Sequence, residues 1–292
     1  MNSIILKAPA KVNLYLKILR KRTDGFHDIV TLFERIGLYD TVTIQKIPQK
    51  KIIVTSNTFI VRKQADNLAH KAAVALIERY RIDEGVRIHV EKRIPIGSGL
   101  GGGSSDAAYV LLGMNKLFGL KLSQDRLIRL GRLFGSDIGF FLLNKSFAIG
   151  KGKGDRLSGL RSRRKFWHLL MVPGFKCSTK EIYQASDLTL TKKNVNVTIK
   201  CLKDLGSRTG GLISVLHNDL QHVVVSKKKA VGTIIERLAK HSNSRTIISG
   251  SGPSVFCLFK TRKEAVRARE RFVRRLPAHQ RKGLRIFIVR TA

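Results

Sequence analysis

The chain has 292 residues, of which 43% are hydrophobic and 26% charged, with 25 Gly and only 6 Pro. This composition excludes the collagen-like, low-complexity and intrinsically disordered classes, and the length is typical of roughly two globular domains. Lysine and arginine number 56 against 20 acidic residues, so the formal net charge is +36. An excess of this size favours contact with anionic ligands.

The cysteines and the start of the chain bear on its environment. Cys177, Cys201 and Cys257 are odd in number and far apart, which favours reduced thiols over a disulfide framework or a zinc site. Before Lys7 the only apolar run is Ile4–Leu6, too short for a secretory signal, and no run of roughly 18 apolar residues occurs. We therefore expect a cytoplasmic protein.

The first part of the chain predicts an antiparallel β segment. Residues 3–56 alternate apolar and polar side chains in short runs, and residues 21–25 have the composition of a hairpin turn. Asp66 is expected to cap the next helix, because apolar residues then recur at helical spacing up to Tyr80. Next in order we expect a strand over residues 85–92, a glycine-rich loop over 95–103 and a helix over 104–117.

The rest of the chain predicts mixed helices and strands. Ser123 is expected to cap a helix that ends near Phe134. A domain boundary is expected in residues 150–165, where glycines alternate with lysines. Further helices are expected near residues 178–186, 213–224, 228–240 and 262–275, and strands near 166–172, 245–249, 254–259 and 284–290.

The glycine-rich loop is the most informative segment. It places five glycines in the seven positions from Gly97 to Gly103, which permits positive φ angles and lets backbone N–H groups converge on one anion. The following helix adds its N-terminal dipole, so the segment predicts a phosphate-binding loop. A Walker A sequence is absent, and the formal match to the dinucleotide-binding pattern lacks its βαβ unit. A flexible linker is the remaining alternative.

A second glycine cluster, Ser249 to Pro253, lies between two strand-like segments of the other half. It is typical of a tight hairpin. Paired with the first loop, it has a second interpretation as another phosphate-facing turn, and the sequence leaves both open.

Two charged residues stand in largely apolar runs. Lys11 lies in a β-forming run, where a lysine on the solvent face of the strand is the alternative interpretation. Asp137 is the only charged residue from Gly135 to Asn144. A partly buried acid needs a partner, and Lys11 is a candidate. In a phosphate site, such a pair suits phosphoryl transfer, with the carboxylate accepting a hydroxyl proton and the ammonium stabilising negative charge.

These motifs resemble those of a known kinase family. Residues 95–108 are similar to the signature of the GHMP kinases, named for galactose, homoserine, mevalonate and phosphomevalonate, and residues 249–253 resemble their third motif. The branch whose acceptor is a cytidine diphosphate-linked methylerythritol is indicated by residues 8–16, 24–27, 31–33, 66–68 and 135–138.

The resemblance implies an α+β (two-layer α/β) fold with two lobes. Residues 1–160 would form a β-rich ATP-binding lobe, and residues 161–292 a ferredoxin-like α+β lobe. The implied activity is phosphorylation of the 2-hydroxyl group of the small-molecule substrate, with ATP and Mg²⁺, in the non-mevalonate (MEP) route to isoprenoid precursors.

The resemblance also implies roles for individual residues. Asp137 would be the catalytic acid-base residue, with Lys11 as its partner. The residues expected to bind the ATP phosphates are Pro95, Gly97, Ser98, Gly99, Leu100, Gly101, Gly102, Gly103, Ser104 and Ser105. The residues expected near the adenine are Asn67, Leu68 and Lys92. The residues expected at the substrate are Asn13, Phe26, His27, Thr179, Tyr183, Gly250, Ser251 and Gly252. Ser104 or Ser105 is the candidate to touch the metal ion.

Two features depart from the family pattern. Gly139 stands where the family usually has proline after the catalytic acid, which puts the rigidity of that turn in doubt. Residues 260–290 hold 12 Lys or Arg, and we interpret any nucleic-acid affinity of this segment as incidental.

Two alternatives stay open: a sister kinase acting on homoserine, mevalonate or a sugar, and a basic nucleic-acid-binding protein on the same fold.

Overall fold

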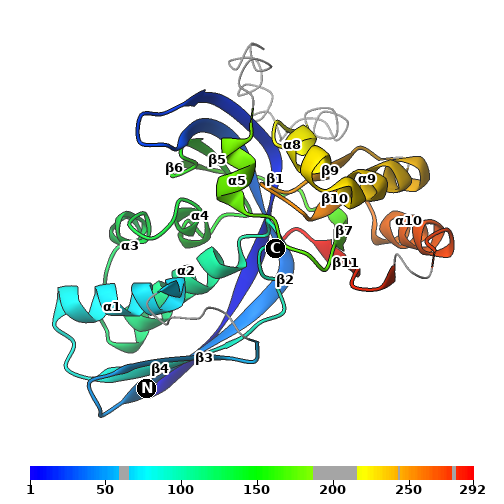
Figure 1. Cartoon of the computed structure of the whole chain (residues 1–292). Coiled ribbons are helices and arrows are strands. Elements are labelled where there is room, and N and C mark those ends of the chain that lie inside the picture. Colours follow the sequence, from blue (N-terminus) through cyan, green and yellow to red (C-terminus); the bar gives the residue numbers. More distant parts are fainter. Residues whose placement is uncertain (59–65, 187–215, 243, 278–280) are drawn as a thin grey trace. The chain divides into compact units, whose positions relative to one another are not determined.

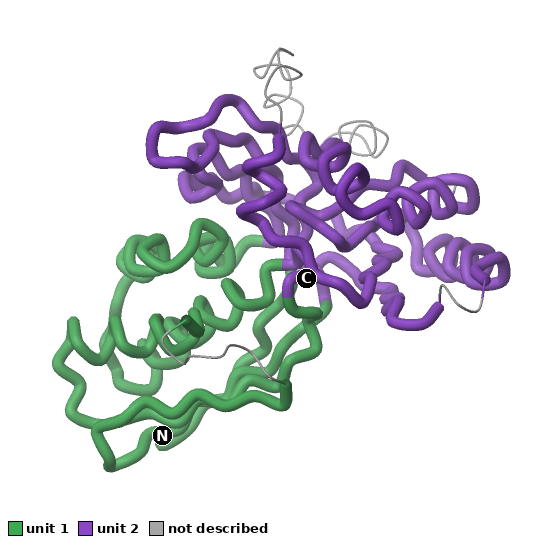
Figure 2. Tube along the Cα trace, in the orientation of Figure 1, with its two compact units in different colours: residues 1–10, 38–96, 101–145 green, residues 11–37, 97–100, 146–292 purple. Residues whose placement is uncertain are grey.

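The computed structural model describes residues 1–58, 66–186, 216–242, 244–277 and 281–292 (Figure 1). The chain divides into two compact units that interleave along the sequence (Figure 2). Unit 1 comprises residues 1–10, 38–96 and 101–145, and unit 2 comprises residues 11–37, 97–100 and 146–292. These units are defined by compactness, so the predicted lobe boundary at residue 160 stays a prediction.

Helices and strands are mixed along the chain, as the sequence predicts. The strands are β1 (Ser3–Lys21), β2 (His27–Ile47), β3 (Ile52–Ser56), β4 (Gly85–Glu91), β5 (Phe147–Gly152), β6 (Arg156–Leu160), β7 (Trp167–Val172), β8 (His217–Asn218), β9 (Thr246–Ile248), β10 (Val255–Phe259) and β11 (Arg285–Arg290). The helices are α1 (Leu68–Tyr80), α2 (Gly102–Leu117), α3 (Gln124–Gly131), α4 (Ile138–Leu142), α5 (Thr179–Gln184), α8 (Gln221–Lys227), α9 (Lys229–Ser242) and α10 (Arg262–Arg274).

Unit 1 combines a sheet with helices that lie on one side of it (Figure 1). Residues Thr41–Ile47 of β2 pair antiparallel with β4, and β3 pairs parallel with β4. In β4, the buried residues Val86, Ile88 and Val90 alternate with exposed ones, so one face of the strand carries the core. Helix α1 packs on α2, and α2 packs on α4.

Unit 2 contains a four-stranded antiparallel sheet in the order β11-β7-β10-β9. Helices α9 and α10 contact this sheet. Their apolar faces share one core with the strands, which includes Leu169, Met171, Val255, Cys257, Leu238 and Phe272. In the same unit, residues Ile29–Glu34 of β2 pair with β5, and β5 pairs with β6.

The starts of two helices test the predicted caps. The cap of α1 is Asn67, whose side-chain oxygen accepts the N–H of Ala69 at 2.9 Å, so the prediction of Asp66 as the cap is wrong. The predicted cap of α3 is confirmed, because the Ser123 hydroxyl accepts the N–H of Arg126. Both side chains satisfy a backbone donor of the first helical turn.

Strands β5 and β6 form a hairpin in the region where a domain boundary was expected. A Cβ on Gly150 would lie 2.8 Å from the carbonyl oxygen of Gly154, and Gly152 and Gly154 have positive φ angles. The alternation of glycine and lysine therefore belongs to a tightly packed hairpin. Sequence reasoning missed both strands, since this pattern is also typical of a linker.

Parts of two predictions fall outside the described residues. The predicted helix over residues 213–224 begins at 213–215, which lie outside them, and the chain then forms β8 and α8. Cys201 also lies outside, whereas Cys177 and Cys257 are buried and carry free thiols. Within the described ranges, no helix combines the length and the apolar character that crossing a bilayer requires.

Candidate active site

The first glycine loop, residues 95–101, connects β4 to α2 as the sequence predicts. Gly97, Gly99 and Gly101 have φ angles of +69°, +81° and +71°. These angles lie in the left-handed region, which glycine adopts without steric cost. A Cβ on Gly99 would also clash with the carbonyl oxygen of Ser249. The alternate glycines are therefore required by the backbone path of the loop.

The second glycine loop, residues 249–254, joins β9 to β10 and contacts the first. The Ser249 hydroxyl donates to the carbonyl oxygen of Gly99 at 3.0 Å, and the N–H of Ser254 donates to that of Ser98 at 3.2 Å. The segment is thus a hairpin connection, and it also lies against the predicted phosphate loop. The hairpin interpretation of this cluster is confirmed, and its interpretation as a phosphate-facing turn stays a prediction.

Lys11 lies at the centre of a buried hydrogen-bond network in unit 2. Its side chain donates to the amide oxygen of Asn13 at 2.7 Å, and only 4% of the residue is exposed. The Asn13 amide donates to the Thr31 hydroxyl at 2.7 Å, and the Asn13 N–H donates to the Ser249 hydroxyl at 3.3 Å. Lys11 is therefore not on the solvent face of the strand, and that interpretation is wrong. The polar partners compensate for the burial of its ammonium group.

Gly250 lets the second loop approach this network. A Cβ at this position would lie 3.2 Å from Asn13 Oδ1 and 3.5 Å from Lys11 Nζ. The Asn218 amide also holds the loop, because it donates to the carbonyl oxygens of Ile248 and Gly250 at 3.0 and 2.8 Å. Sequence reasoning missed Asn218, since nothing in its local sequence marks it.

The residues expected to bind the cytosine base, Phe26, His27 and Tyr183, all belong to unit 2. The rings of His27 and Tyr183 lie in contact, with centroids 5.3 Å apart. Burial, helped by the charge of Lys21, lowers the pKa of His27, which keeps the imidazole neutral near neutral pH. Phe26 is 57% exposed, and Lys153 Nζ lies 4.6 Å from its ring centroid. A solvent-accessible aromatic face is therefore present beside His27.

Thr179, at the start of α5, connects the same region to the second loop. Its hydroxyl lies 2.9 Å from the Ser251 hydroxyl, within hydrogen-bond distance. The structure thus brings two predicted substrate residues together across 72 positions of sequence.

In unit 1, the start of α2 lies beside the turn that carries Asp137. A Cβ on Gly135 would lie 3.9 Å from Ser104 Oγ. Asp137 is half-buried and immediately precedes α4, yet its carboxylate makes no cap hydrogen bond to that helix. Ser105 is fully buried, and its hydroxyl has no hydrogen-bond partner among the described residues. Polar side chains thus gather where a helix dipole favours an anion.

Gly139 is a buried residue of α4, and its carbonyl oxygen accepts the N–H of Leu143 at 3.1 Å. The helical turn after Asp137 therefore forms with glycine in the place where the family resemblance leads us to expect proline.

The residues predicted near the adenine all lie close to the start of α1 or α2. The Asn67 side chain caps α1, and a Cβ on Gly103 would lie 3.9 Å from Leu68 Cδ1. Lys92 donates to the carboxylates of Asp40 and Asp106, the latter at 2.7 Å. Sequence reasoning missed this charged cluster, because its members are up to 66 positions apart.

The charges in this cluster shift each other's ionisation. Burial raises the pKa of Asp106 to about 7, although the ammonium of Lys92 acts against this shift. Burial opposes the charge of Lys92, but the carboxylates of Asp106 and Asp40 outweigh it and raise the pKa of the ammonium. Burial disfavours the charge of both groups. The attraction between opposite charges outweighs burial for Lys92 but not for Asp106.

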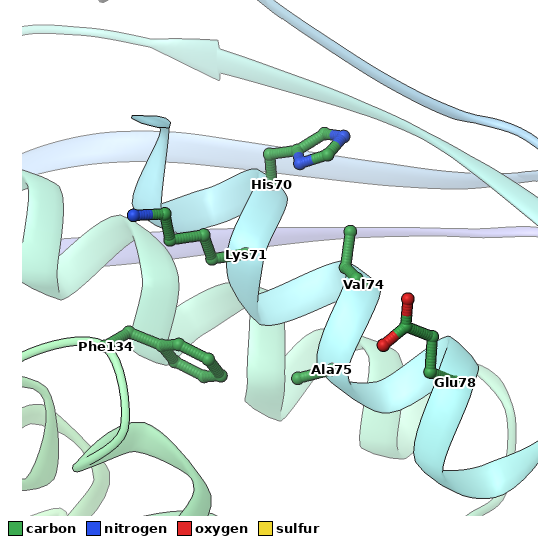
Figure 3. A pocket seen from close by; sticks show the side chains of 6 residues that line it. All are labelled: His70, Lys71, Val74, Ala75, Glu78 and Phe134. Atoms are coloured by element: carbon green, nitrogen blue, oxygen red, sulfur yellow. The ribbon is translucent and has the colours of Figure 1, made fainter. Parts of the chain in front are cut away.

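A separate shallow groove of about 380 Å³ follows the outer face of α1 (Figure 3). Phe134 and Lys71 lie on one side of the helix in this view, and His70, Val74 and Glu78 on the other. The groove contains none of the predicted site residues. The described residues also contain no group of three His, Cys, Asp or Glu side chains placed to hold a metal ion.

Comparison with known proteins identifies the family. The models of the GHMP kinases N-terminal and C-terminal domains match residues 67–145 and 199–278, and the chain belongs to the GHMP kinases. A curated relative from Caldicellulosiruptor saccharolyticus, a 4-diphosphocytidyl-2-C-methyl-D-erythritol kinase, is 39% identical over 268 residues, which cover 92% of each chain. Within the GHMP kinases, the chain is a member of this 4-diphosphocytidyl-2-C-methyl-D-erythritol kinase family.

Solved structures agree with the fold. A crystal structure of 4-(cytidine 5'-diphospho)-2C-methyl-D-erythritol kinase is 29% identical, has a TM-score of 0.78, and is matched over 99% of this chain and 100% of that chain. Homoserine kinase from Cytophaga hutchinsonii has a TM-score of 0.74 at 15% identity over 100% of this chain and 95% of that chain, which supports the fold alone. The predicted α+β fold of the GHMP kinases is confirmed.

Proposed function

We propose that this chain transfers the terminal phosphoryl group of ATP to the 2-hydroxyl group of 4-diphosphocytidyl-2-C-methyl-D-erythritol. The bond between the terminal phosphorus and its bridging oxygen breaks, a bond from the 2-hydroxyl oxygen forms, and ADP leaves. The names of the curated relatives support this substrate. The product belongs to the non-mevalonate (MEP) route to isoprenoid precursors, and the enzyme works in the cytoplasm.

One observation of the structure carries the proposal. Lys11, Asn13 and Ser249 form a continuous hydrogen-bonded path to the carbonyl oxygen of Gly99. The buried ammonium of Lys11 is thereby connected to both glycine loops. Phosphoryl transfer requires a fixed positive group that stabilises the developing negative charge, and this network would fix it.

Asp137 accepts the proton of the substrate hydroxyl as the new bond to phosphorus forms, and Lys11 stabilises the negative charge. A carboxylate is suited to this step because it accepts hydrogen bonds through two oxygens when ionised.

The phosphates of ATP bind to the backbone N–H groups of residues 97–103 and to the start of α2. The positive φ angles of the loop support this role, and so does the hydroxyl of Ser105, which has no hydrogen-bond partner in the described part of the chain. Mg²⁺ neutralises phosphate charge when bound, and Ser104 or Ser105 would contact it through a hydroxyl oxygen, a ligand type that this ion accepts. Asn67, Leu68 and Lys92 border the adenine.

The acceptor is held by residues of unit 2. The cytosine stacks on Phe26 and hydrogen-bonds to His27, and Tyr183 forms the opposite wall of the base pocket. Asn13 faces the methylerythritol portion. Thr179 and residues 250–252 complete the pocket, which the contact between the Thr179 and Ser251 hydroxyls supports.

Turnover of purified protein with ATP, Mg²⁺ and the cytidine diphosphate substrate tests the proposal. We expect ADP and the 2-phosphorylated product, with inhibition by CMP or CDP. Homoserine and mevalonate are the control acceptors. Turnover of a control acceptor without inhibition by CMP would contradict the assigned substrate, and folded protein that turns over none of the three would contradict the proposal as a whole.

A further inference from the structure

We propose that Asp40 and Asp106, joined by Lys92, are positioning residues that fix the phosphate loop in its binding conformation. The inference rests on the proposed function, since it assigns the ATP phosphates to this loop. It concerns three charged side chains of unit 1 that come from different segments: Asp40 from β2, Lys92 from the residue after β4, and Asp106 from the second turn of α2.

Asp40 holds the chain where it enters the loop. One oxygen of its carboxylate accepts the backbone N–H groups of Arg93 and Ile94 at 2.6 and 2.8 Å. The other oxygen accepts a hydrogen bond from Lys92 Nζ. Asp40 is fully buried. Its carboxylate therefore serves three donors from three consecutive residues, and an asparagine with one oxygen cannot replace it.

Lys92 connects Asp40 to helix α2, which begins where the loop ends. Its ammonium donates to Asp106 at 2.7 Å, and the side chains of Lys92 and Asp106 are only 5% and 7% exposed. A Cβ on Gly102, the first residue of α2, would lie 3.1 Å from Lys92 Nζ. The absence of a side chain at Gly102 thus lets the ammonium reach the start of the helix.

The cluster therefore joins the segment before the loop to the helix after it. The loop must present its N–H groups to phosphate in a set geometry, and fixing both ends reduces the rearrangement that binding requires. Asp40 and Asp106 need not touch the nucleotide for this effect. Lys92 also borders the adenine in the proposed site, so the two aspartates carry the main test. Charged pairs suit the purpose, because buried hydrogen bonds to ions are stronger than neutral ones.

The test compares Asp40→Asn and Asp106→Asn with Asp83→Asn. Asp83 forms an ion pair with Lys50 on the surface of the same unit, with side chains 87% and 74% exposed, so its substitution is a matched control. Binding of ADP and of CDP is measured separately by calorimetry on the full chain. For Asp40→Asn we expect the Kd of ADP to rise about tenfold or more and the Kd of CDP to change less than about twofold.

The Asp106→Asn variant keeps an oxygen that accepts from Lys92, so a rise of about threefold in the Kd of ADP is expected. The control should match the wild type. Equal losses for ADP and CDP would overturn the inference, since they would indicate a general loss of structure. An unchanged Kd of ADP in Asp40→Asn would overturn it as well.

Two further measurements keep the inference testable if Asp40→Asn does not fold. Lys92→Arg retains the positive charge and should lose less affinity for ADP than Lys92→Met, for which we expect a loss of about tenfold. Amide exchange in the wild type should be slow at Arg93 and Ile94 before ADP is added. Fast exchange there, or equal affinities in the two Lys92 variants, would contradict the anchoring.

Failure of this inference is distinct from failure of the proposed function. Wild-type turnover together with an unchanged Kd of ADP in Asp40→Asn removes the positioning role alone. Wild-type ADP binding that depends on Asp40, without turnover of the cytidine diphosphate substrate, supports the positioning role and removes the assigned reaction.

Discussion

The two glycine loops are held by different chemistry. The segments flanking the first loop are fixed by three charged side chains, Asp40, Lys92 and Asp106, which bind one another and the backbone. The second loop is fixed by neutral groups, because Asn218 donates to its carbonyl oxygens and Ser249 contacts Gly99. Substitution of a group that holds one loop should therefore weaken the binding of one ligand, ATP or the acceptor, more than that of the other.

This difference agrees with the proposed roles. In the proposed reaction the first loop would bind a highly charged triphosphate, and charged anchors would prevent its backbone from shifting as phosphate binds. The second loop lies against Asn13 and Lys11, where uncharged partners hold the backbone without adding charge near the reacting groups.

Among the substitutions that separate the two loops, the largest effect is expected at Lys11. Lys11→Met removes the buried ammonium and its hydrogen bond to Asn13. We expect kcat to fall about 10²–10³-fold, with a smaller change in the Kd of ADP, because the ammonium acts mainly on charge that develops during the reaction. Steady-state kinetics and calorimetry measure the two quantities. The control is Lys7→Met on the exposed part of the same strand, and a kcat within about threefold of wild type for both variants would contradict the role.

A smaller effect is expected where the loops touch. Gly99→Ala places a methyl group against the Ser249 carbonyl at a φ of +81°, so the loops must separate. We expect ADP and CDP each to bind about tenfold more weakly, and the free energy of unfolding to fall by at least about 2 kcal/mol.

Gly119→Ala is the matched control for this substitution, since Gly119 has a φ of +63° and open space around it. It separates the cost of backbone strain from that of the clash. Equal destabilisation of the two variants in urea unfolding would show that contact between the loops contributes nothing.

A still smaller, one-sided effect is expected at the second loop. Asn218→Ala removes the hydrogen bonds to Ile248 and Gly250. The KM of the acceptor should rise about threefold to tenfold, while the KM of ATP stays within about twofold. Initial-rate measurements with each substrate varied in turn provide the comparison. A larger rise for ATP than for the acceptor would reverse the assignment of the two loops.

The smallest effect concerns His27, whose pKa is lowered from its ordinary value of 6.5 by burial and by Lys21. The unfolded chain then binds the proton more readily than the folded chain. The free energy of unfolding should therefore fall as pH decreases below 6.5, and should be unaffected by this group above it. His27→Gln should reduce this fall in urea unfolding between about pH 5 and 7. An identical pH dependence in both proteins would contradict the shift.

Features that depend only on neighbouring residues, such as glycine turns and helix caps, can be predicted from the sequence. The positions of Gly97, Gly99 and Gly101 could be predicted, because only glycine adopts positive φ at low cost and the loop stands between a strand and a helix. The cap at Ser123 follows from the same kind of local rule, since its hydroxyl satisfies a donor three residues away.

The remaining features depend on contacts that span the chain. Residues 8–18 of β1 are all buried, so both faces of the strand are covered there. Alternation of side chains does not reveal such cover, and the burial of Lys11 could not be predicted. The contact between Ser249 and Gly99 joins residues 150 positions apart, and Asp40 binds backbone groups 53 and 54 positions later. Neither distance leaves a periodic signal in the sequence, which is why Asp40 and Asn218 were missed.

The proposed reaction depends most directly on the carboxylate of Asp137. Asp137→Asn preserves the size of the side chain and removes its capacity to accept a proton. Single-turnover kinetics with saturating ATP and acceptor should give a rate at least about 10³-fold below the wild type, with the Kd of ADP changed by less than about threefold. A variant that turns over at a rate near the wild type would contradict the assignment of Asp137 and with it the proposed mechanism.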